Sequence, residues 1–380
     1  MPPLPQARQG QRVEVKQRPV PFSFWPSRRG RLHYGLQSLL FARDPWLVIG
    51  RTVKNECPRN RQPEALAYLE QSMDFYSAAT SAGITAARPL ALYYSFMNLV
   101  KSYCLTRGAR ATFDQAQHGL SEQRAPGTRE LLGALLRAFP SVPANPANNF
   151  DEFMQVYSGT GLAAARDYQL PVLLPQIVPG HRLWAQAAKE NERFIAIHDL
   201  QFWHRLANRT MWLNLYFLAD DLSRLSVTHQ RLLDESRLAG AFREVACNLQ
   251  FQGRDLLCIE QIATHAYPGG YPADEFEHVI DPIRGRVWVT VGTVSPYRRY
   301  YVYLSGPAEQ PFVLPQVLSM YAIMYYIGSI TRYRPHQYDA IVKGAYGPWI
   351  QEFVNGQPLQ FIYLMASEFA KQDVTKPSIL

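Results

Sequence analysis

The stretch that decides the fold is Ser319–His336, SMYAIMYYIGSITRYRPH, in which a nearly uncharged apolar run ends in basic and aromatic residues. The run is long enough for a helix and carries no charge before Arg332. A membrane span is the alternative, but a span needs about 20 predominantly apolar residues. Polar residues, a proline and a glycine interrupt the run from 312 to 330. We therefore expect a buried helix that ends on a cluster facing an anion.

The composition bounds the class of protein. The chain has 380 residues, 47% of them hydrophobic, which is enough for a large buried core. Its net charge of +8 favours contact with phosphates, acidic proteins or an anionic surface. Its four cysteines show neither paired nor zinc-ligand spacing, and no apolar run resembles a secretion signal. We expect a cytoplasmic bacterial protein without metal, cofactor or membrane contact.

A basic, proline-rich segment opens the chain and is expected to form an arm over residues 1–45. Between Met1 and Arg43 the only acidic residue is Glu14. Such composition is typical of segments that are flexible or that become ordered on a partner. Arg28 and Arg29 are its candidate contacts with nucleic acid or another anion.

Helical patterns occupy most of the remaining chain. Proline at a first helical position and glycine after a last one mark helix ends. By these signals, helices start near Pro63 and Pro89, the second ending at Gly108. Apolar spacing predicts further helices after Thr128, over Phe202–Leu222 and over Thr228–Ala246, and starts near Pro315, Pro348 and Pro358.

The period changes to two between residues 276 and 304. RVWVTVG and YRRYYVYL alternate and are rich in β-branched and aromatic residues, which indicates strands. We expect a mainly α protein of the α+β class, with a small antiparallel sheet inserted near residues 276–304. The expected divisions are the arm, a helical region over 46–180 and a second helical region over 181–380, with a single domain over both regions as the alternative. The sequence GTGLAA at 159–164 lacks the context of a dinucleotide site and predicts a loop.

Several segments together resemble the YaaC-like family of bacterial proteins. They are LYYSFMNLVKSYC at 92–104, the His118-Gly119-Leu120 tripeptide, and the stretches 170–180 and 314–335. The resemblance covers most of residues 60–340 and brings no reaction with it. Over residues 64–120 the Tyr-Tyr helix followed by His-Gly is similar to the second half of a HEPN-type helical hairpin. HEPN domains are often ribonucleases or their inactive relatives in antiphage settings, so this resemblance implies contact with nucleic acid.

Two clusters combine arginine forks, which bind phosphate, with rings on which bases stack. They comprise Arg298, Arg299 and Tyr300 in one case, and Arg332, Arg334 and His336 in the other. Both lie at the ends of expected elements, where side chains can converge. The alternative is structural: the arginines bond helix-end carbonyls, and the tyrosines pack in the sheet.

A candidate polar site lies on the central helix and the turn after it. Asn98 and Lys101 share one helix face, and His118 follows in a turn. They could reach a ligand, or they could be buried polar groups that bond nearby loops.

A ribonuclease of the HEPN type would need arginine and histidine four to six residues apart on a helix. This chain has that spacing at Arg28/His33, Arg193/His198 and Arg224/His229, but none lies where the resemblance would place it. We therefore favour a nucleic-acid-associated protein without catalytic activity, one component of a bacterial multi-protein complex, with antiviral defence as its setting. The alternatives are a metal-independent ribonuclease and a structural adaptor that docks an acidic partner protein.

Overall fold

The computed structural model describes residues 3–15, 17–25, 39–81, 83–124, 133–142, 146–269 and 272–378. They form two compact units, each discontinuous in sequence. Unit 1 comprises Met1–Arg43, Asn191–Pro311 and Lys371–Leu380, and unit 2 comprises Asp44–Glu190 and Phe312–Ala370. The units are therefore not consecutive segments of the chain, because each one combines residues that are far apart in the sequence.

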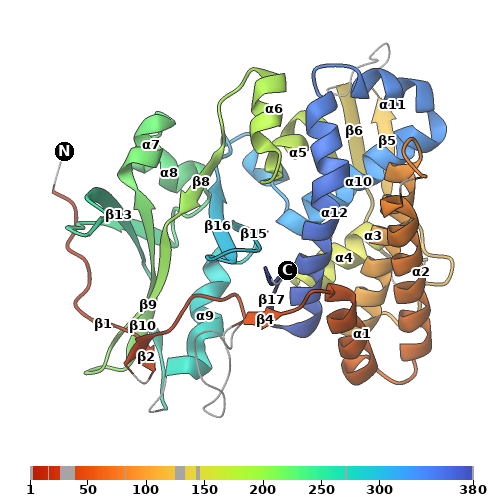
Figure 1. The fold of residues 1–380 in the computed structure, drawn as a ribbon. Coiled ribbons are helices and arrows are strands. Elements are labelled where there is room, and N and C mark those ends of the chain that lie inside the picture. Colours follow the sequence, from red (N-terminus) through yellow and green to blue (C-terminus); the bar gives the residue numbers. More distant parts are fainter. Residues whose placement is uncertain are drawn as a thin grey trace. The chain divides into compact units, whose positions relative to one another are not determined.

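Unit 2 is mainly helical. Its helices are α1 (Pro45–Glu56), α2 (Gln62–Thr80), α3 (Arg88–Arg107), α4 (Asn149–Ser158), α5 (Leu170–Leu173), η3 (Leu174–Gln176), α6 (His181–Ala188), α10 (Gln316–Tyr333), α11 (Pro335–Val342) and α12 (Gly347–Ala370). An antiparallel sheet has the order β5 (Leu120–Arg124), β6 (Ala134–Ala138) and β7 (Arg166–Gln169). Figure 1 shows α2 and α3 side by side within this unit.

Local signals explain where the central helices begin and end. Asp44 caps α1 by accepting a hydrogen bond from the Trp46 backbone N–H at 2.9 Å. Pro89 lies in the first turn of α3, and Gly108 ends the helix where a Cβ would lie 2.6 Å from the Cys104 carbonyl. The predicted helices at Pro63, Pro89 and Pro315 are therefore confirmed.

The core of unit 2 is built around α3, which is buried on almost every side. Phe96 is 0% exposed and stacks on Phe361 of α12, with ring centroids 3.8 Å apart. On another side α10 approaches closely at Gly328, where an added Cβ would lie 2.8 Å from the Cβ of Tyr93. Leu92, Phe96, Leu99 and Tyr103 are all buried along α3.

Two helix predictions in unit 2 are wrong, and one loop prediction is confirmed. The helix expected after Thr128 is strand β6 where the structure describes it, because alternate residues there pack inward. Pro358 lies inside α12 instead of starting a helix. The sequence GTGLAA follows α4 as a loop, with Gly159 at φ +77°, a conformation that glycine adopts readily.

Unit 1 is built on antiparallel sheets. The larger sheet has the order β1 (Gln11–Arg12), β9 (Asp199–Arg205), β10 (Thr210–Leu218), β13 (Arg254–Gln261) and β11 (Phe242–Val245), with β12 (Gln250–Phe251) on β13 and β14 (His265–Ala266) on β10. A second sheet has the order β15 (Val287–Val291), β16 (Arg298–Tyr303) and β8 (Phe194–Ile197).

Smaller elements complete unit 1. They are the hairpin β2 (Glu14–Val15) with β3 (Arg18–Pro19), the parallel pair β4 (Leu39–Phe41) with β17 (Asp373–Thr375), the helices α7 (Ala219–Arg224), α8 (His229–Glu235) and α9 (Phe276–Ile280), and the 3-10 turns η4 (Pro272–Glu275) and η5 (Asp281–Ile283).

The larger sheet corrects the prediction of a helix over Phe202–Leu222. Met211, Leu213, Leu215 and Phe217 of β10 face the main core, while Trp212 and Tyr216 are buried on the opposite face. A strand buried on both faces has a continuous apolar sequence that cannot be told from a buried helix by its period. The helix over Thr228–Ala246 is confirmed only for α8, since the end of that stretch is β11.

The predicted small sheet is confirmed, and the predicted arm is in part integral to unit 1. β15 and β16 pair within residues 276–304, although residues 276–280 there form α9. Val13 and Val20 are buried in the main core of unit 1, so the flexibility expected of the arm does not hold for these residues. The fold is of the α+β class with more helix than strand, as predicted. Within the described ranges, no helix has the length and apolar character needed to cross a membrane.

The stacking of Phe96 on Phe361 predicts a large effect of truncation. Phe96→Ala should lower the free energy of unfolding by about 3 to 5 kcal/mol, because a fully buried ring leaves a cavity. Met73→Ala on α2 is the control, since Met73 is exposed and should change stability by about 0.5 kcal/mol or less. Urea denaturation followed by circular dichroism measures both. Equal, small losses would contradict the packing described.

Candidate functional site

The candidate site in unit 2 is centred on His118. The Nδ1 atom of its ring lies 2.5 Å from the Tyr93 hydroxyl oxygen. Burial lowers the pKa of His118, and the positive charges of Lys101 and Arg332 lower it further. The charged groups that act on this ring are thus both cations, which favours its neutral form at pH 7. The tripeptide His118-Gly119-Leu120 thus lies against α3 and α10, because the His118 ring contacts Tyr93 and Tyr325.

The turn that carries His118 is held by α4. The backbone N–H of Asn149 donates to the Gln117 carbonyl at 2.9 Å, and that of Phe150 donates to the His118 carbonyl at 3.3 Å. Gly119 has φ +73°, and a Cβ there would lie 3.0 Å from the Asn148 Cβ. Glycine fits both constraints, so the histidine ring is presented from a rigid backbone.

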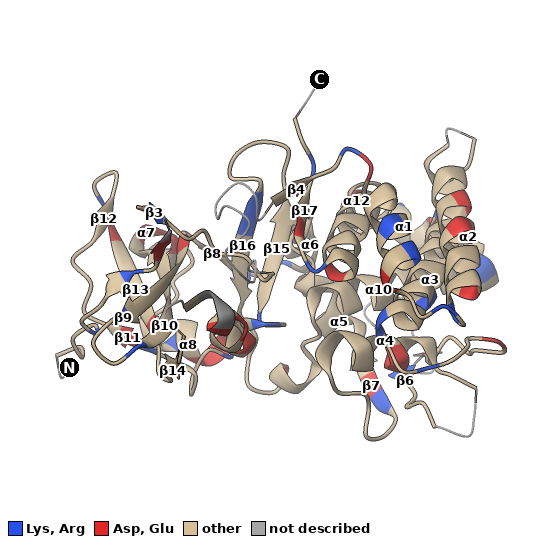
Figure 2. Cartoon of the chain, turned by 90° about the horizontal axis from the view of Figure 1, so that it is seen from below, with Lys and Arg blue, Asp and Glu red and all other residues tan. Residues whose placement is uncertain are grey.

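Lys101 approaches the site from α3. Its side chain is 8% exposed, and the ammonium lies 4.7 Å from the centre of the Tyr68 ring on α2. Burial lowers the pKa of Lys101, an effect opposed by the acidic Glu64 and Asp114. Figure 2 shows the acidic positions along α2. Within the described residues the ammonium has no hydrogen-bond acceptor or ion pair.

Asn98 lies between Tyr94 and Lys101 on the same face of α3. Its side-chain N–H donates to Gln71 at 3.3 Å, and its side chain is buried. This is the arrangement expected of a buried polar group that bonds a neighbouring helix. Of the predicted polar site, the structure therefore places Lys101 near enough to His118 for its charge to lower the pKa of the ring, and it leaves Asn98 with a packing role.

Arg332 reaches the site from the last turn of α10. Its Nη1 donates to the Tyr94 hydroxyl at 3.0 Å, and its guanidinium lies 5.0 Å from the centre of the Tyr333 ring. Tyr94 in turn stacks on Phe75 of α2. Arg332 is exposed, and it has no carboxylate partner in the part of the chain that the structure describes. It is therefore a charged donor framed by aromatic rings.

Arg334 differs from Arg332, although the two are close in sequence. Arg334 forms an ion pair with Glu122 of β5, whose second oxygen accepts a hydrogen bond from Ser329 at 3.2 Å. This ion pair neutralises the positive charge of Arg334. Burial raises the pKa of the nearby Tyr325 to about 12, and the charge of Glu122 contributes in the same direction. His336 is exposed at the start of α11 and makes no hydrogen bond or ion pair within the described ranges.

The cluster at Arg298 belongs to unit 1, and the Arg332 cluster belongs to unit 2. Arg298 is buried, lies 3.4 Å from the Asp373 carboxylate and donates to the Val374 carbonyl at 3.0 Å. Tyr300 packs against Phe22 and Phe24, whereas Arg299 is exposed. Arg28 and Arg29 lie outside the described residues.

The predicted arginine–histidine pairs have separate partners. Arg193 pairs with Glu309 at 2.7 Å, and the His198 ring lies against Phe251. His229 pairs with Glu244, and Arg224 lies at 4.0 Å from Glu192. Arg28/His33 falls outside the described residues. Among the residues described, no three His, Cys, Asp or Glu side chains gather in a way that could hold a metal ion.

Sequence reasoning missed Tyr93, Tyr68 and Glu122, which position the site. The Tyr93-Tyr94 dipeptide was visible in the sequence, but its pattern alone indicates only a packed helix. Its two rings diverge in the structure, Tyr93 toward His118 and Tyr94 toward Arg332. No local sequence pattern pointed to Glu122, because its partner, Arg334, lies 212 residues further along the chain, from position 122 to position 334.

Comparison with known proteins agrees with the resemblance found in the sequence. A model of the family described as YaaC-like protein matches residues 36–369. No curated protein and no solved structure matches the chain. The resemblance to the HEPN hairpin stays a prediction.

The burial of Arg298 predicts a structural role that its neighbour does not share. Arg298→Ala should cost about 3 to 5 kcal/mol, because it leaves the Asp373 carboxylate buried without a counter-charge. Arg299→Ala, the matched exposed control, should change stability by about 0.5 kcal/mol or less. Adding Asp373→Asn to Arg298→Ala should restore part of the loss. Thermal and urea unfolding measure all variants, and additive losses in the double variant would contradict the pairing.

Proposed function

The chain belongs to the YaaC-like family, and we propose that unit 2 binds a phosphate-bearing nucleic-acid strand through Lys101, His118 and Arg332. The observation that carries the proposal is the Tyr93-Tyr94 pair of α3, which contacts His118 through one hydroxyl and Arg332 through the other. The positive charges of Lys101 and Arg332 both act on the histidine ring. This group carries positive charge and N–H donors, and a phosphate would supply the negative charge and the acceptor oxygens that match them. The overall charge of +8 acts in the same direction at longer range.

The aromatic rings around Arg332 favour a nucleic acid over a small inorganic anion. Tyr333 is 66% exposed beside the guanidinium, and Tyr94 accepts a hydrogen bond from it. An exposed ring next to a phosphate donor is the combination on which bases of a single strand stack. Arg332 would then hold the backbone while Tyr333 offers a stacking surface. In this proposal the protein binds the strand without cleaving it.

A metal-independent ribonuclease is the second candidate, and one observation favours it. The Tyr93 hydroxyl engages Nδ1 of His118, while Nε2 has no partner in the described part of the chain. Since the pKa of His118 is lowered, the ring is neutral at pH 7 and could accept a proton from a ribose 2′-hydroxyl. The cations Lys101 and Arg332 would then hold the phosphate. Binding and cleavage depend on opposite protonation states of the same ring, which makes them separable.

The predictions about the biological setting of the protein are based on its sequence alone. Membership of a multi-protein complex, a role in antiviral defence and docking of an acidic protein stay predictions. Of these, the adaptor would share the basic surface but not the stacking ring. Loss of strand binding with retention of an acidic protein partner would favour the adaptor.

Arg332 is the residue whose loss should affect binding most directly. Arg332→Gln should weaken binding of a labelled single-stranded RNA by about tenfold and lower the salt slope by about one, since one phosphate contact is lost. Lys343→Gln is the control, because Lys343 is an exposed cation of unit 2 that already pairs with Asp339. Fluorescence anisotropy at two salt concentrations measures both. Equal affinity of the wild type and Arg332→Gln, both folded, would refute the site.

The pH dependence tests His118 separately. The free ring is neutral at pH 7, and a bound phosphate favours its protonated form, so strand affinity should rise as the pH falls from 8 to 6. One proton limits the rise to about tenfold per pH unit. His118→Gln should bind with little dependence on pH. Cleavage of RNA by a histidine base would show the reverse, with activity falling as the pH falls. If the affinity of the wild type depended on pH as little as that of His118→Gln, the ring would be excluded from the site.

A further inference from the structure

The side chains of Arg237 and Arg286 of unit 1 link two turns, those at Arg237 and at Gly285, by bonding backbone carbonyls. The Arg237 guanidinium donates through Nη2 to the Gly285 carbonyl at 3.0 Å. The Arg286 guanidinium donates through Nη1 to the Arg237 carbonyl at 2.6 Å. Arg237 follows α8 with φ +62°, a conformation uncommon for a residue with a side chain, and Arg286 precedes β15. The two bonds bring the side chains of both arginines to the same pair of turns, close enough for the charge of Arg286 to act on Arg237.

In the part of the chain that the structure describes, no carboxylate is bonded to either of these arginines. Burial lowers the pKa of Arg237 to about 10, and the charge of Arg286 lowers it further, with no carboxylate acting in the opposite direction. Neither arginine forms an ion pair within the described ranges. Other partly buried arginines of the same unit do: Arg193 with Glu309, Arg243 with Glu260 and Arg298 with Asp373.

The three paired arginines each have a carboxylate that balances their charge, whereas Arg237 and Arg286 have none among the described residues. Two like charges held close together repel each other, and partial burial strengthens the repulsion because water screens it less. A carboxylate at this position would remove the cost. An anion from solution would do the same, and it would find donors already placed for it.

We propose that Arg237 and Arg286 form a binding site for a phosphate group in unit 1. Each guanidinium has five N–H donors and uses one nitrogen for the backbone bonds described, so each keeps donors for a tetrahedral oxyanion. Neither side chain is fully buried, and none of their nitrogens belongs to the buried polar atoms that lack a partner. The fork geometry of arginine suits two oxygens of one phosphate. The residues of this site belong to unit 1, whereas those of the site proposed above belong to unit 2.

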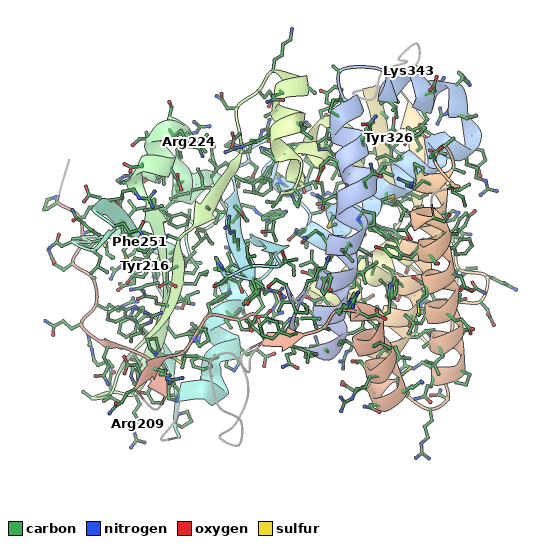
Figure 3. All side chains as sticks on the ribbon, in the orientation of Figure 1. Arg209, Tyr216, Arg224, Phe251, Tyr326 and Lys343 are labelled. Atoms are coloured by element: carbon green, nitrogen blue, oxygen red, sulfur yellow. The ribbon has the colours of Figure 1, made fainter. Side chains whose placement is uncertain are left out.

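The competing explanation is that the two arginines only stabilise the turn at Gly285 through their hydrogen bonds to backbone carbonyls. That role needs N–H donors but does not need two positive charges. Glutamine keeps an N–H donor and removes the charge, so Arg286→Gln distinguishes the two roles. Arg209 gives a matched control in the same unit, since it also has a positive φ, +49°, and donates to a backbone carbonyl, that of Pro268 at 3.3 Å, with no second arginine bonded to it. Arg209 is labelled in Figure 3.

The experiment measures inorganic phosphate binding to the full chain by calorimetry, with chloride at equal ionic strength as the reference. The Arg332→Gln variant is used as the background, so that phosphate bound in unit 2 does not obscure the result. Arg286→Gln should weaken phosphate binding by about tenfold or more, whereas Arg209→Gln should leave it unchanged. Should Arg286→Gln fail to fold, Arg286→Lys keeps the charge, loses the fork and should bind with intermediate affinity. No phosphate binding in the background protein, or equal binding in Arg286→Gln, would overturn the proposal.

A second arm identifies the source of the phosphate. The same variants are titrated with a single-stranded oligonucleotide and, separately, with a small phosphate monoester. If Arg286→Gln weakens oligonucleotide binding, the site takes the backbone of a strand. If it weakens only the binding of phosphate and the monoester, the site takes a small phosphate-bearing molecule. Failure of the site in unit 2 would leave these results intact, because Arg332 is already replaced.

Discussion

The close approach of α3 and α10 at Gly328 is the constraint on which the site in unit 2 depends. A Cβ at position 328 would lie 2.8 Å from the Cβ of Tyr93, so the two helices can meet this closely only at a residue without a side chain. The approach sets Tyr93 against the Tyr321 and Tyr325 rings and within reach of His118. Arg332 follows Gly328 by one helical turn, which brings its guanidinium to Tyr94. One glycine thus positions both the histidine and the cation beside it.

Burial decides which arginines are available to a ligand. Arg332 and Arg334 are two residues apart, yet Arg334 is neutralised by Glu122 while Arg332 has only aromatic neighbours and a hydroxyl. Arg298 and Arg299 show the same division on a strand, where successive side chains point to opposite faces. An arginine taken out of water needs a counter-charge. The pair Arg237 and Arg286 is notable because it has none.

The helices could be predicted where local signals act together. Pro89 and Gly108 mark the ends of α3, and its apolar residues fill the space between them. Strand β10 has an equally apolar sequence but no such signals at its ends. It is paired along both edges with β9 and β13, and its side chains are buried on both faces. Its state was therefore decided by its neighbours and not by its own period. The same reason explains why β6 was taken for a helix and why Pro358 is accommodated within α12.

The sequence by itself determined the α+β class, the central helices of unit 2, the strand pair at β15 and β16, the family and a short set of candidate residues, because each of these depends on local pattern or composition. The tertiary structure decided which candidates meet. It assigned Arg298 and Arg332 to different units, set His118 and Arg332 against the neighbouring rings Tyr93 and Tyr94, and gave Arg334 a buried carboxylate partner. These outcomes depend on distances between residues far apart in the chain, such as positions 118 and 332. Local pattern carries no information on such distances, since they are set by helix packing and by the pairing of buried charges.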